Sequence, residues 1–227
     1  LCAGTANKDM YRSYGVSEET LFSFAYSWGY QEFLDIAGEL KSQKDQCRAD
    51  LGIPREDFVL LFCGRLCKEK SPFDLLEAYS RVHGPGKSLV IVGDGELYQP
   101  MRTYASEHGL DSVYFLGFRN REEIAKYYAV ADVLILPSNR ETWGIVVSES
   151  MCFGLPVITS DQVGASTDLV QDGYNGYCYP AGDAPALADA IERLMALPKD
   201  EIAAMGNRSR DIMERWSEKD LGESLVT

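Results

Sequence analysis

The sequence has few of the features that mark membrane, metal or nucleic-acid proteins. It has no run of about 18 apolar residues, so no membrane span is expected. It has only 22 Lys and Arg against 35 Asp and Glu, and the formal charge of −13 argues against nucleic acid or an anionic membrane as partner. The two histidines, His83 and His108, have no ligand spacing to a cysteine cluster, so we expect no metal.

Cysteine pairing motifs are also missing. No CxxC pair occurs among the six cysteines, which stand at positions 2, 47, 63, 67, 152 and 178. This pattern is typical of reduced thiols in a cytoplasmic protein. The chain begins LCAGTANKDM, with neither Met nor a basic-then-apolar leader, and we expect an excised piece of a longer protein.

From residue 57 onward, strand and helix patterns alternate. Strands are predicted at Phe58–Cys63, Leu89–Val92, Val113–Leu116, Val133–Leu136, Val157–Ser160 and Gly176–Tyr179, and helices at 72–83, 95–109, 121–131, 144–153, 184–197 and 199–216. Several strands are continuous Val, Ile and Leu runs, which indicate burial on both faces. The expected fold class is therefore α/β, with a Rossmann-like doubly wound parallel sheet.

The first 56 residues show a different pattern. Thr20–Tyr26 has the composition of a strand, and Gln31–Leu51 has the pattern of one amphipathic helix before Gly52-Ile53-Pro54.

The segment Pro137–Pro156 is the most informative part of the chain. It places Glu141 and Glu149 on either side of a Trp-Gly turn that opens a helix, between two buried strands. A helix start directs free backbone N–H groups at an anion. The alternative is that both glutamates are ordinary surface acids, since acidic residues are frequent here.

Other polar residues follow the remaining strands. Arg65 and Lys70 come after the first strand, Gly93 after the second and Phe118 after the third. Carboxyl ends of parallel strands share one edge of a sheet, where ligands bind. A planar guanidinium and a mobile ammonium suit phosphate oxygens, although an ordinary basic loop is an alternative. Phe118 with Arg119 either flanks a nucleobase or only packs.

Two further aromatic and glycine positions leave alternatives open. Trp143 either lines a sugar pocket or belongs to the core. Gly93-Asp94-Gly95 lacks the third glycine of a dinucleotide fingerprint, and we expect a tight turn that leaves room beside a nucleotide.

Together these motifs resemble retaining, nucleotide-sugar-dependent glycosyltransferases of the two-domain GT-B fold, the glycosyl transferases group 1 type. The resemblance covers roughly residues 10–217 and implies the C-terminal, donor-binding domain. It implies that Arg65 and Lys70 clamp the donor diphosphate with the helix start at Gly144, Ile145 and Val146. Glu149, about one turn along that helix, is placed to accept bonds from the ribose hydroxyls, and the same role is implied by the family. Glu141 is expected to bind the donor hexose, and the catalytic assignments are Glu141, Arg65 and Lys70.

The resemblance also suggests a domain division. Residues 1–56 would be a hinge and a remnant of the N-terminal acceptor domain, 57–205 the donor-binding domain, and 206–227 a C-terminal helix that returns toward the missing domain. The expected partners are that domain and a UDP-, GDP- or ADP-linked sugar, with no cofactor. A cytoplasmic location is expected, with contact to the inner membrane only through the missing domain.

The expected function is transfer of a hexosyl group to an acceptor with retention of configuration, and we expect this piece alone to be inactive. The alternatives are a non-catalytic nucleotide-sugar-binding subunit, an epimerase, or a phosphorylase on the same architecture. One position departs from the family pattern, in which glycine often follows the second lysine. Here Ser71-Pro72 stands instead, and we expect Ser71 to cap the next helix with Pro72 at its first position.

Overall fold

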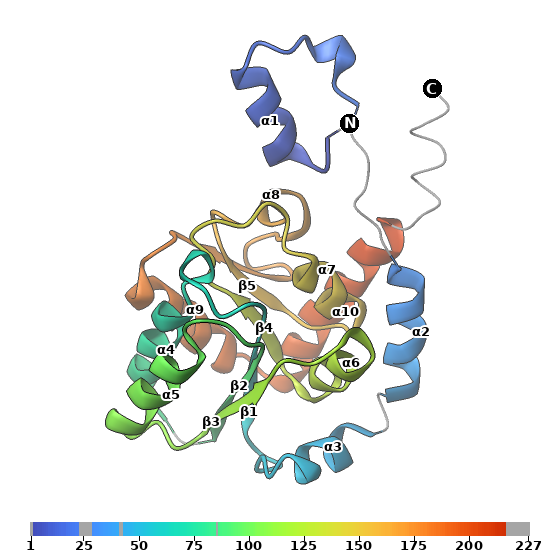
Figure 1. Ribbon diagram of the computed structural model, residues 1–227. Coiled ribbons are helices and arrows are strands. Elements are labelled where there is room, and N and C mark those ends of the chain that lie inside the picture. Colours follow the sequence, from blue (N-terminus) through green and yellow to red (C-terminus); the bar gives the residue numbers. More distant parts are fainter. Residues whose placement is uncertain (1, 23–28, 41–42, 85, 217–227) are drawn as a thin grey trace.

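Six parallel strands form a single sheet in the order β3-β2-β1-β4-β5-β6 (Figure 1). The structure is a computed structural model that describes residues 2–22, 29–40, 43–84 and 86–216. The strands are β1 (Phe58–Cys63), β2 (Lys87–Val92), β3 (Val113–Gly117), β4 (Val133–Leu136), β5 (Val157–Ser160) and β6 (Gly176–Tyr179). This strand order is that of the doubly wound Rossmann fold, so the expected fold class is confirmed.

Helices cover both faces of the sheet, as Figure 1 shows. One face carries α4 (Pro72–Arg81), α5 (Tyr98–Glu107) and α9 (Ala184–Met195). The other carries α6 (Arg121–Val130), α7 (Ile145–Cys152) and α10 (Lys199–Arg215), with α2 (Tyr30–Leu40) and α3 (Lys44–Asp50) packed outside them. No helix in these described ranges is long and apolar enough to cross a membrane.

The strands form where apolar residues run without interruption. All side chains of β4 and β5 are buried, as are five of six in β1 and in β2. Helix α9 begins where expected, because the Asp183 carboxylate accepts a hydrogen bond from the Ala186 backbone N–H at 2.9 Å. Helix α5 begins later than the predicted residue 95, since Gly95 has a φ of 155°, which is not helical.

The N-terminal residues differ most from expectation. The predicted single helix over Gln31–Leu51 is wrong, because α2 ends at Leu40 and α3 begins at Lys44 as a separate element. Part of the predicted strand Thr20–Tyr26 lies outside the described residues, and Thr20 itself ends a 3₁₀ turn that starts at Glu18. Both α2 and α3 pack on α6, so they belong to the main body. The predicted division at 205/206 falls inside α10.

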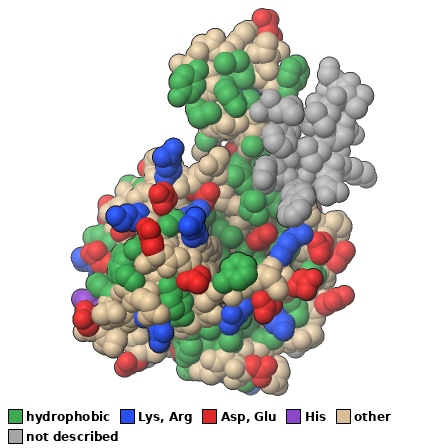
Figure 2. All heavy atoms as spheres, viewed as in Figure 1, with side chains coloured by type: hydrophobic (Ala, Val, Ile, Leu, Met, Phe, Trp, Pro, Cys, Tyr) green, Lys and Arg blue, Asp and Glu red, His purple; other side chains and the backbone are tan. Residues whose placement is uncertain are grey.

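Residues 2–22 form a small lobe above the carboxyl edge of the sheet (Figure 1). It contains α1 (Thr5–Ser13), which approaches α8 (Ser166–Leu169), and the Thr5 backbone N–H donates to Asp168 at 2.9 Å. Hydrophobic side chains gather on the surface of this lobe in Figure 2. Tyr14 is 79% exposed and Phe22 is 54% exposed.

Candidate functional site

The chain reverses its direction of winding between β1 and β4, the two strands at the middle of the sheet. In open parallel sheets such a switch point leaves a crevice outside the carboxyl ends of the strands, where ligands bind. The loop after β1 carries Arg65 and Lys70, and the loop after β4 carries Glu141. Backbone N–H groups of Asn139 and Arg140 donate to the Glu69 carbonyl at 2.9 and 3.2 Å, which joins the two loops.

Lys70 and Glu141 form an ion pair across this switch point. Both side chains are largely buried, with exposed fractions of 21% and 15%. Burial lowers the pKa of the Lys70 ammonium, because the charged form is less well solvated there. Two side chains that the sequence assigned to one ligand are thus brought together, and each is neutralised by the other.

Arg65 lies on the same loop after β1 as Lys70 and is exposed. Within the described residues it forms no ion pair, so its guanidinium can accept an anionic partner. The loop that carries it is fixed by backbone bonds: the Leu66 N–H donates to Asp94 O at 2.9 Å, and the Leu97 N–H donates to Leu66 O at 3.1 Å.

Gly93 allows the loops after β1 and β2 to touch. Its φ is 145°, and a Cβ atom there would clash with the Gly64 carbonyl oxygen. The close approach that the sequence predicted at this glycine is therefore made to protein backbone. A position for Gly93 beside a nucleotide stays a prediction.

The start of α7 presents unpaired donors. Gly144 precedes the helix with a φ of 95°, and the Val147 N–H already donates to the Gly144 carbonyl at 2.9 Å. The N–H groups of Ile145 and Val146 come in the first turn, which has no intrahelical acceptor for them. With the helix dipole, they favour an anion by roughly 0.3–1 kcal/mol.

Gly164 holds the loop that carries Glu141. The Gly164 N–H donates to the Glu141 carbonyl at 3.0 Å, and a Cβ on Gly164 would clash with the Thr142 carbonyl. From the sequence, Val163-Gly164-Ala165 resembles a family loop near the donor, but this contact with the Glu141 loop was not predicted.

Glu149 lies on α7 with its carboxylate half-buried. It accepts a hydrogen bond from the Tyr128 hydroxyl at 2.8 Å. Burial raises the pKa of Glu149, and the Tyr128 hydrogen bond opposes this rise by favouring the charged form.

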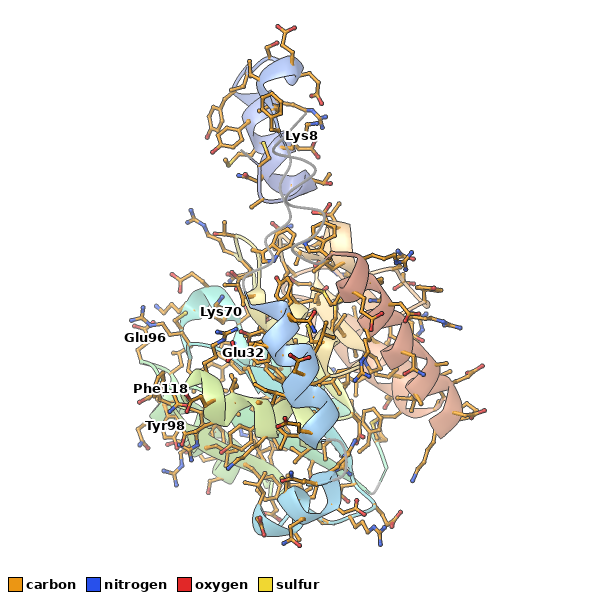
Figure 3. All side chains as sticks on the ribbon, turned by 90° about the vertical axis from the view of Figure 1, so that its right-hand side faces the viewer. Lys8, Glu32, Lys70, Glu96, Tyr98 and Phe118 are labelled. Carbon is orange, nitrogen blue, oxygen red and sulfur yellow. The ribbon has the colours of Figure 1, made fainter. Side chains whose placement is uncertain are left out.

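The aromatic candidates separate clearly. Phe118 is 72% exposed, so packing into the core does not explain it. Figure 3 shows it on the same side of the body as Lys70 and Glu96. The Arg119 guanidinium beside it donates to the Tyr127 hydroxyl at 2.9 Å. Trp143 is only 6% exposed and stacks on Trp216 with ring centroids 6.0 Å apart, so it is a core aromatic.

Ser71 stands at the N-cap of α4, with Pro72 at the first helical position as expected. The expected side-chain cap is wrong, because the Ser71 side chain makes no capping hydrogen bond. Its φ of 44° lies in the left-handed region, and it is the only non-glycine residue with positive φ in the described ranges. A tight turn between Lys70 and α4 imposes this conformation.

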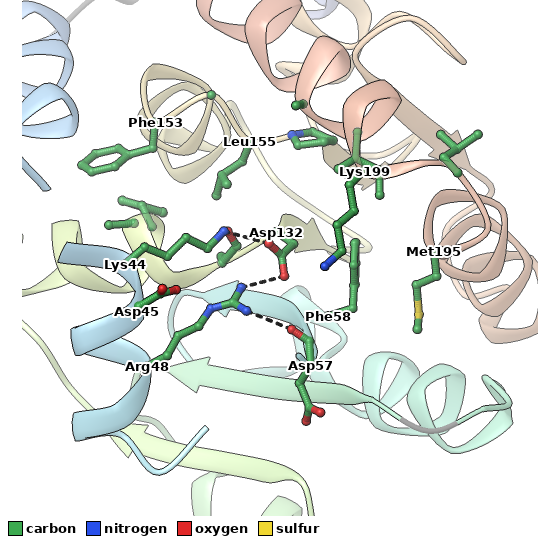
Figure 4. A pocket seen from close by; sticks show the side chains of 18 of the residues that line it. Lys44, Asp45, Arg48, Asp57, Phe58, Asp132, Phe153, Leu155, Met195 and Lys199 are labelled. Atoms are coloured by element: carbon green, nitrogen blue, oxygen red, sulfur yellow. Dashed lines mark hydrogen bonds and ion pairs between the residues drawn. The ribbon is translucent and has the colours of Figure 1, made fainter. Parts of the chain in front are cut away.

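A cavity of about 840 Å³ lies at the opposite, amino edge of the sheet (Figure 4). There Asp132, at the start of β4, accepts bonds from the Arg48 guanidinium at 2.7 Å, the Lys44 ammonium at 2.8 Å and the Val59 N–H at 2.8 Å. Arg48 also donates to the carbonyls of Val130 and Asp57, at 2.7 and 3.0 Å. The hydrogen-bonding groups of Asp132 and Arg48 are satisfied by the protein itself, and no pattern in the sequence predicts this cluster.

The family described as "Glycosyl transferases group 1" matches residues 43–212. A D-inositol 3-phosphate glycosyltransferase of Saccharomonospora viridis is 32% identical over 191 residues, which cover 79% of this chain and 44% of that protein. An N-acetyl-alpha-D-glucosaminyl L-malate synthase of Bacillus anthracis is 30% identical over 183 residues, which cover 79% of this chain and 46% of that protein.

Solved structures share the fold. The Anabaena HepE structure in complex with UDP and glucose has a TM-score of 0.84 at 22% identity, covering 99% of this chain and 61% of that chain. Sucrose-phosphate synthase from Thermosynechococcus elongatus has a TM-score of 0.71 at 29% identity, covering 80% of this chain and 47% of that one. The chain spans about half the length of the curated relatives it matches.

Proposed function

The chain belongs to the glycosyl transferases group 1 family, and we propose that it is the donor-binding half of a hexosyltransferase. The donor is a nucleotide diphosphate sugar, and the acceptor site lies in the part of the protein outside this chain. The configuration at the sugar's anomeric carbon is retained.

One observation carries this proposal: the residues expected to contact a nucleotide sugar follow one another along one edge of the sheet. Arg65 and Lys70 lie at the switch point with the start of α7, where an anion is favoured from two sides. Glu149 stands about one helical turn further along α7, and Glu141 precedes the helix. This order matches diphosphate, ribose and hexose in a single extended ligand.

In this proposal, Lys70 exchanges its partner when the ligand binds. The diphosphate replaces Glu141 as the partner of Lys70, and the released Glu141 carboxylate then accepts bonds from two hexose hydroxyls. Breaking the Lys70–Glu141 pair lowers the affinity for the free diphosphate, and the bonds between Glu141 and the hexose offset this loss when the ligand is the nucleotide sugar.

Catalysis in this proposal acts on the leaving group. The bond between the anomeric carbon and the diphosphate oxygen breaks while the acceptor oxygen bonds to the same face of that carbon. The acceptor's proton passes to a phosphate oxygen. Arg65, Lys70 and the N–H groups of α7 stabilise the charge that develops on the departing diphosphate, and two cations with a helix start do so without a metal ion.

The test is calorimetric titration of this chain with UDP, GDP and ADP and with their glucose- or mannose-linked forms. UDP is titrated first because the HepE structure, which shares this fold, is a complex with UDP and glucose. We expect one nucleotide to bind with a Kd in the micromolar range. Lys199→Ala is the control variant. It removes one positive charge from a side chain that is 94% exposed and lies at the amino edge, away from the proposed site. Failure of all these ligands to bind the chain at millimolar concentration would contradict the proposal.

A further inference from the structure

The hydroxyl of Tyr128 is the buried contact of Glu149. Tyr128 is fully buried on α6, and its hydroxyl donates to the Glu149 Oε2 atom at 2.8 Å. Its ring is held on two sides, by Phe33 of α2 at 6.3 Å and by Phe153 after α7 at 5.4 Å between ring centroids. The hydroxyl therefore has a fixed position, because the ring that carries it cannot move without disturbing the packing of the core.

Within the described residues, the bond from Tyr128 is the hydrogen bond that orients the Glu149 carboxylate. In the described part of the chain, Tyr128 is the one side chain that donates a hydrogen bond to the Glu149 carboxylate. A carboxylate has two oxygens and about four acceptor sites, so the bond to Oε2 leaves Oε1 available to a ligand. Fixing one oxygen also fixes the plane in which the other accepts hydrogen bonds.

The other groups that face the Glu149 carboxylate do not fix it in this way. Burial raises the pKa of Glu149, and the charge of Arg121, at the start of α6, opposes this rise. Burial and the charge of Glu149 in turn raise the pKa values of Tyr30 on α2, Cys63 on β1 and Cys152 on α7. Among these groups, Tyr128 alone combines full burial with a direct hydrogen bond to the carboxylate.

We propose that Tyr128 is a positioning residue that aims Glu149 at the ribose hydroxyls and so makes the site prefer ribonucleotides to deoxyribonucleotides. This inference rests on the proposed donor site. It goes beyond that site in assigning sugar discrimination in the nucleotide to a tyrosine that touches no ligand.

The test compares Tyr128→Phe with the unchanged chain, because phenylalanine keeps the buried ring and removes only the donor. The probes are the nucleoside diphosphate that binds tightest among UDP, GDP and ADP, and its 2′-deoxy form. We expect the unchanged chain to prefer the ribose form by about tenfold, the scale of hydrogen bonds to a charged group. We expect Tyr128→Phe to reduce that preference to about twofold and to leave the affinity for the deoxy form nearly unchanged.

A double-mutant cycle separates positioning from a general loss of packing. If Tyr128 acts through Glu149, then Tyr128→Phe has no further effect on ribose preference once Glu149→Gln is present. Tyr79→Phe is the matched control, because Tyr79 is also a buried tyrosine, 3% exposed, with its hydroxyl bonded to the Lys87 carbonyl at 3.1 Å at the far edge of the sheet. It should leave ribose preference unaltered.

The outcomes distinguish this inference from the proposed function. If no nucleotide binds the unchanged chain, the donor site itself is wrong. If a nucleotide binds and Tyr128→Phe keeps the full ribose preference, the donor site stands and the role of Tyr128 is overturned. Equal weakening of both the ribose and the deoxy form by Tyr128→Phe also overturns it, because that result describes a packing defect.

Discussion

The amino and carboxyl edges of the sheet carry similar charged residues, but the protein pairs these charges completely at one edge and incompletely at the other. At the amino edge, Asp132 is bonded by Arg48, Lys44 and a backbone N–H. At the carboxyl edge, Lys70 and Glu141 form an ion pair, while Arg65 on the same loop as Lys70 has no ion-pair partner among the described residues.

The difference lies in how completely the protein satisfies its own charges. The Arg48 side chain is only 6% exposed, and its N–H groups donate to backbone carbonyls and to Asp132. No donor of Arg48 is therefore available to a ligand. The carboxyl edge keeps an exposed cation and the first N–H groups of α7, which have no acceptor among the described residues. Saturated charges indicate a structural role, and unsaturated charges at a switch point indicate binding. Asp132 and Arg48, which line the cavity at the amino edge, are charges of the first kind.

Asp132→Asn should have the largest effect, and only on stability. It leaves the nearly buried Arg48 and the adjacent Lys44 without their counter-charge, and loss of one partner from a buried ion pair costs about 3 kcal/mol. Urea denaturation measures the change. Asp45→Asn is the control, since Asp45 and Arg55 are 65% and 76% exposed and such pairs contribute about 0–1 kcal/mol. A loss of nucleotide binding by folded Asp132→Asn would break the distinction between the edges.

Arg65→Ala should weaken ligand binding and leave stability unchanged, the reverse of Asp132→Asn. We expect nucleoside diphosphate binding to weaken by about 1.5–3 kcal/mol, the scale of a charge-assisted hydrogen bond, whichever base the nucleotide carries. Stability should be unchanged because the exposed side chain forms no ion pair within the described chain. Calorimetry and urea denaturation on the same sample give both values. Unchanged affinity with reduced stability would make Arg65 structural.

Glu141→Gln and Glu149→Gln should sharpen the comparison within the carboxyl edge. Glu149→Gln should weaken the free diphosphate and the nucleotide sugar alike, by about 1.5 kcal/mol. Glu141→Gln should weaken only the nucleotide sugar, by a similar amount. The free diphosphate should bind Glu141→Gln equally or more tightly, because Lys70 is no longer neutralised by a carboxylate. Four titrations at one ionic strength decide this, and equal losses throughout would mean that the two carboxylates share one role.

Ser71→Gly should give the smallest effect. A left-handed conformation costs a non-glycine residue roughly 1–2 kcal/mol, and glycine's greater freedom in the unfolded chain offsets part of the gain. We expect the free energy of unfolding to rise by about 0.5 kcal/mol, measured by urea denaturation, with nucleotide affinity unchanged. A fall in stability would show that Ser71 is held there by contacts of its own side chain.

The sheet was predictable from the sequence because its strands are buried on both faces. Phe58–Cys63, Val133–Leu136, Val157–Ser160 and Gly176–Tyr179 were predicted with the bounds that the structure has. The carboxyl-edge residues were also predictable as a group, since every parallel strand ends on the same edge.

Tertiary contacts decided what the sequence could not show. The break between α2 and α3 carries no glycine or proline signal, and the pairing of Lys70 with Glu141 joins residues 71 positions apart. The Asp132 and Arg48 bond spans 84 positions and uses residue types that are usually exposed. The sequence around Tyr128 predicts only a helix, so it does not show that the Tyr128 hydroxyl bonds to Glu149. How these residues meet a ligand stays a prediction.

The contact between Gly93 and Gly64 has a consequence for the thermodynamics of binding. Ordering the backbone of one residue costs about 1–2 kcal/mol of conformational entropy. The residues on both sides of Arg65 are already fastened to the loop after β2 by backbone hydrogen bonds, so that entropy is lost when the chain folds. A ligand therefore meets a preorganised loop and has only side chains to immobilise. Enlarging Gly93 would force the loops apart and transfer the cost of ordering from folding to binding.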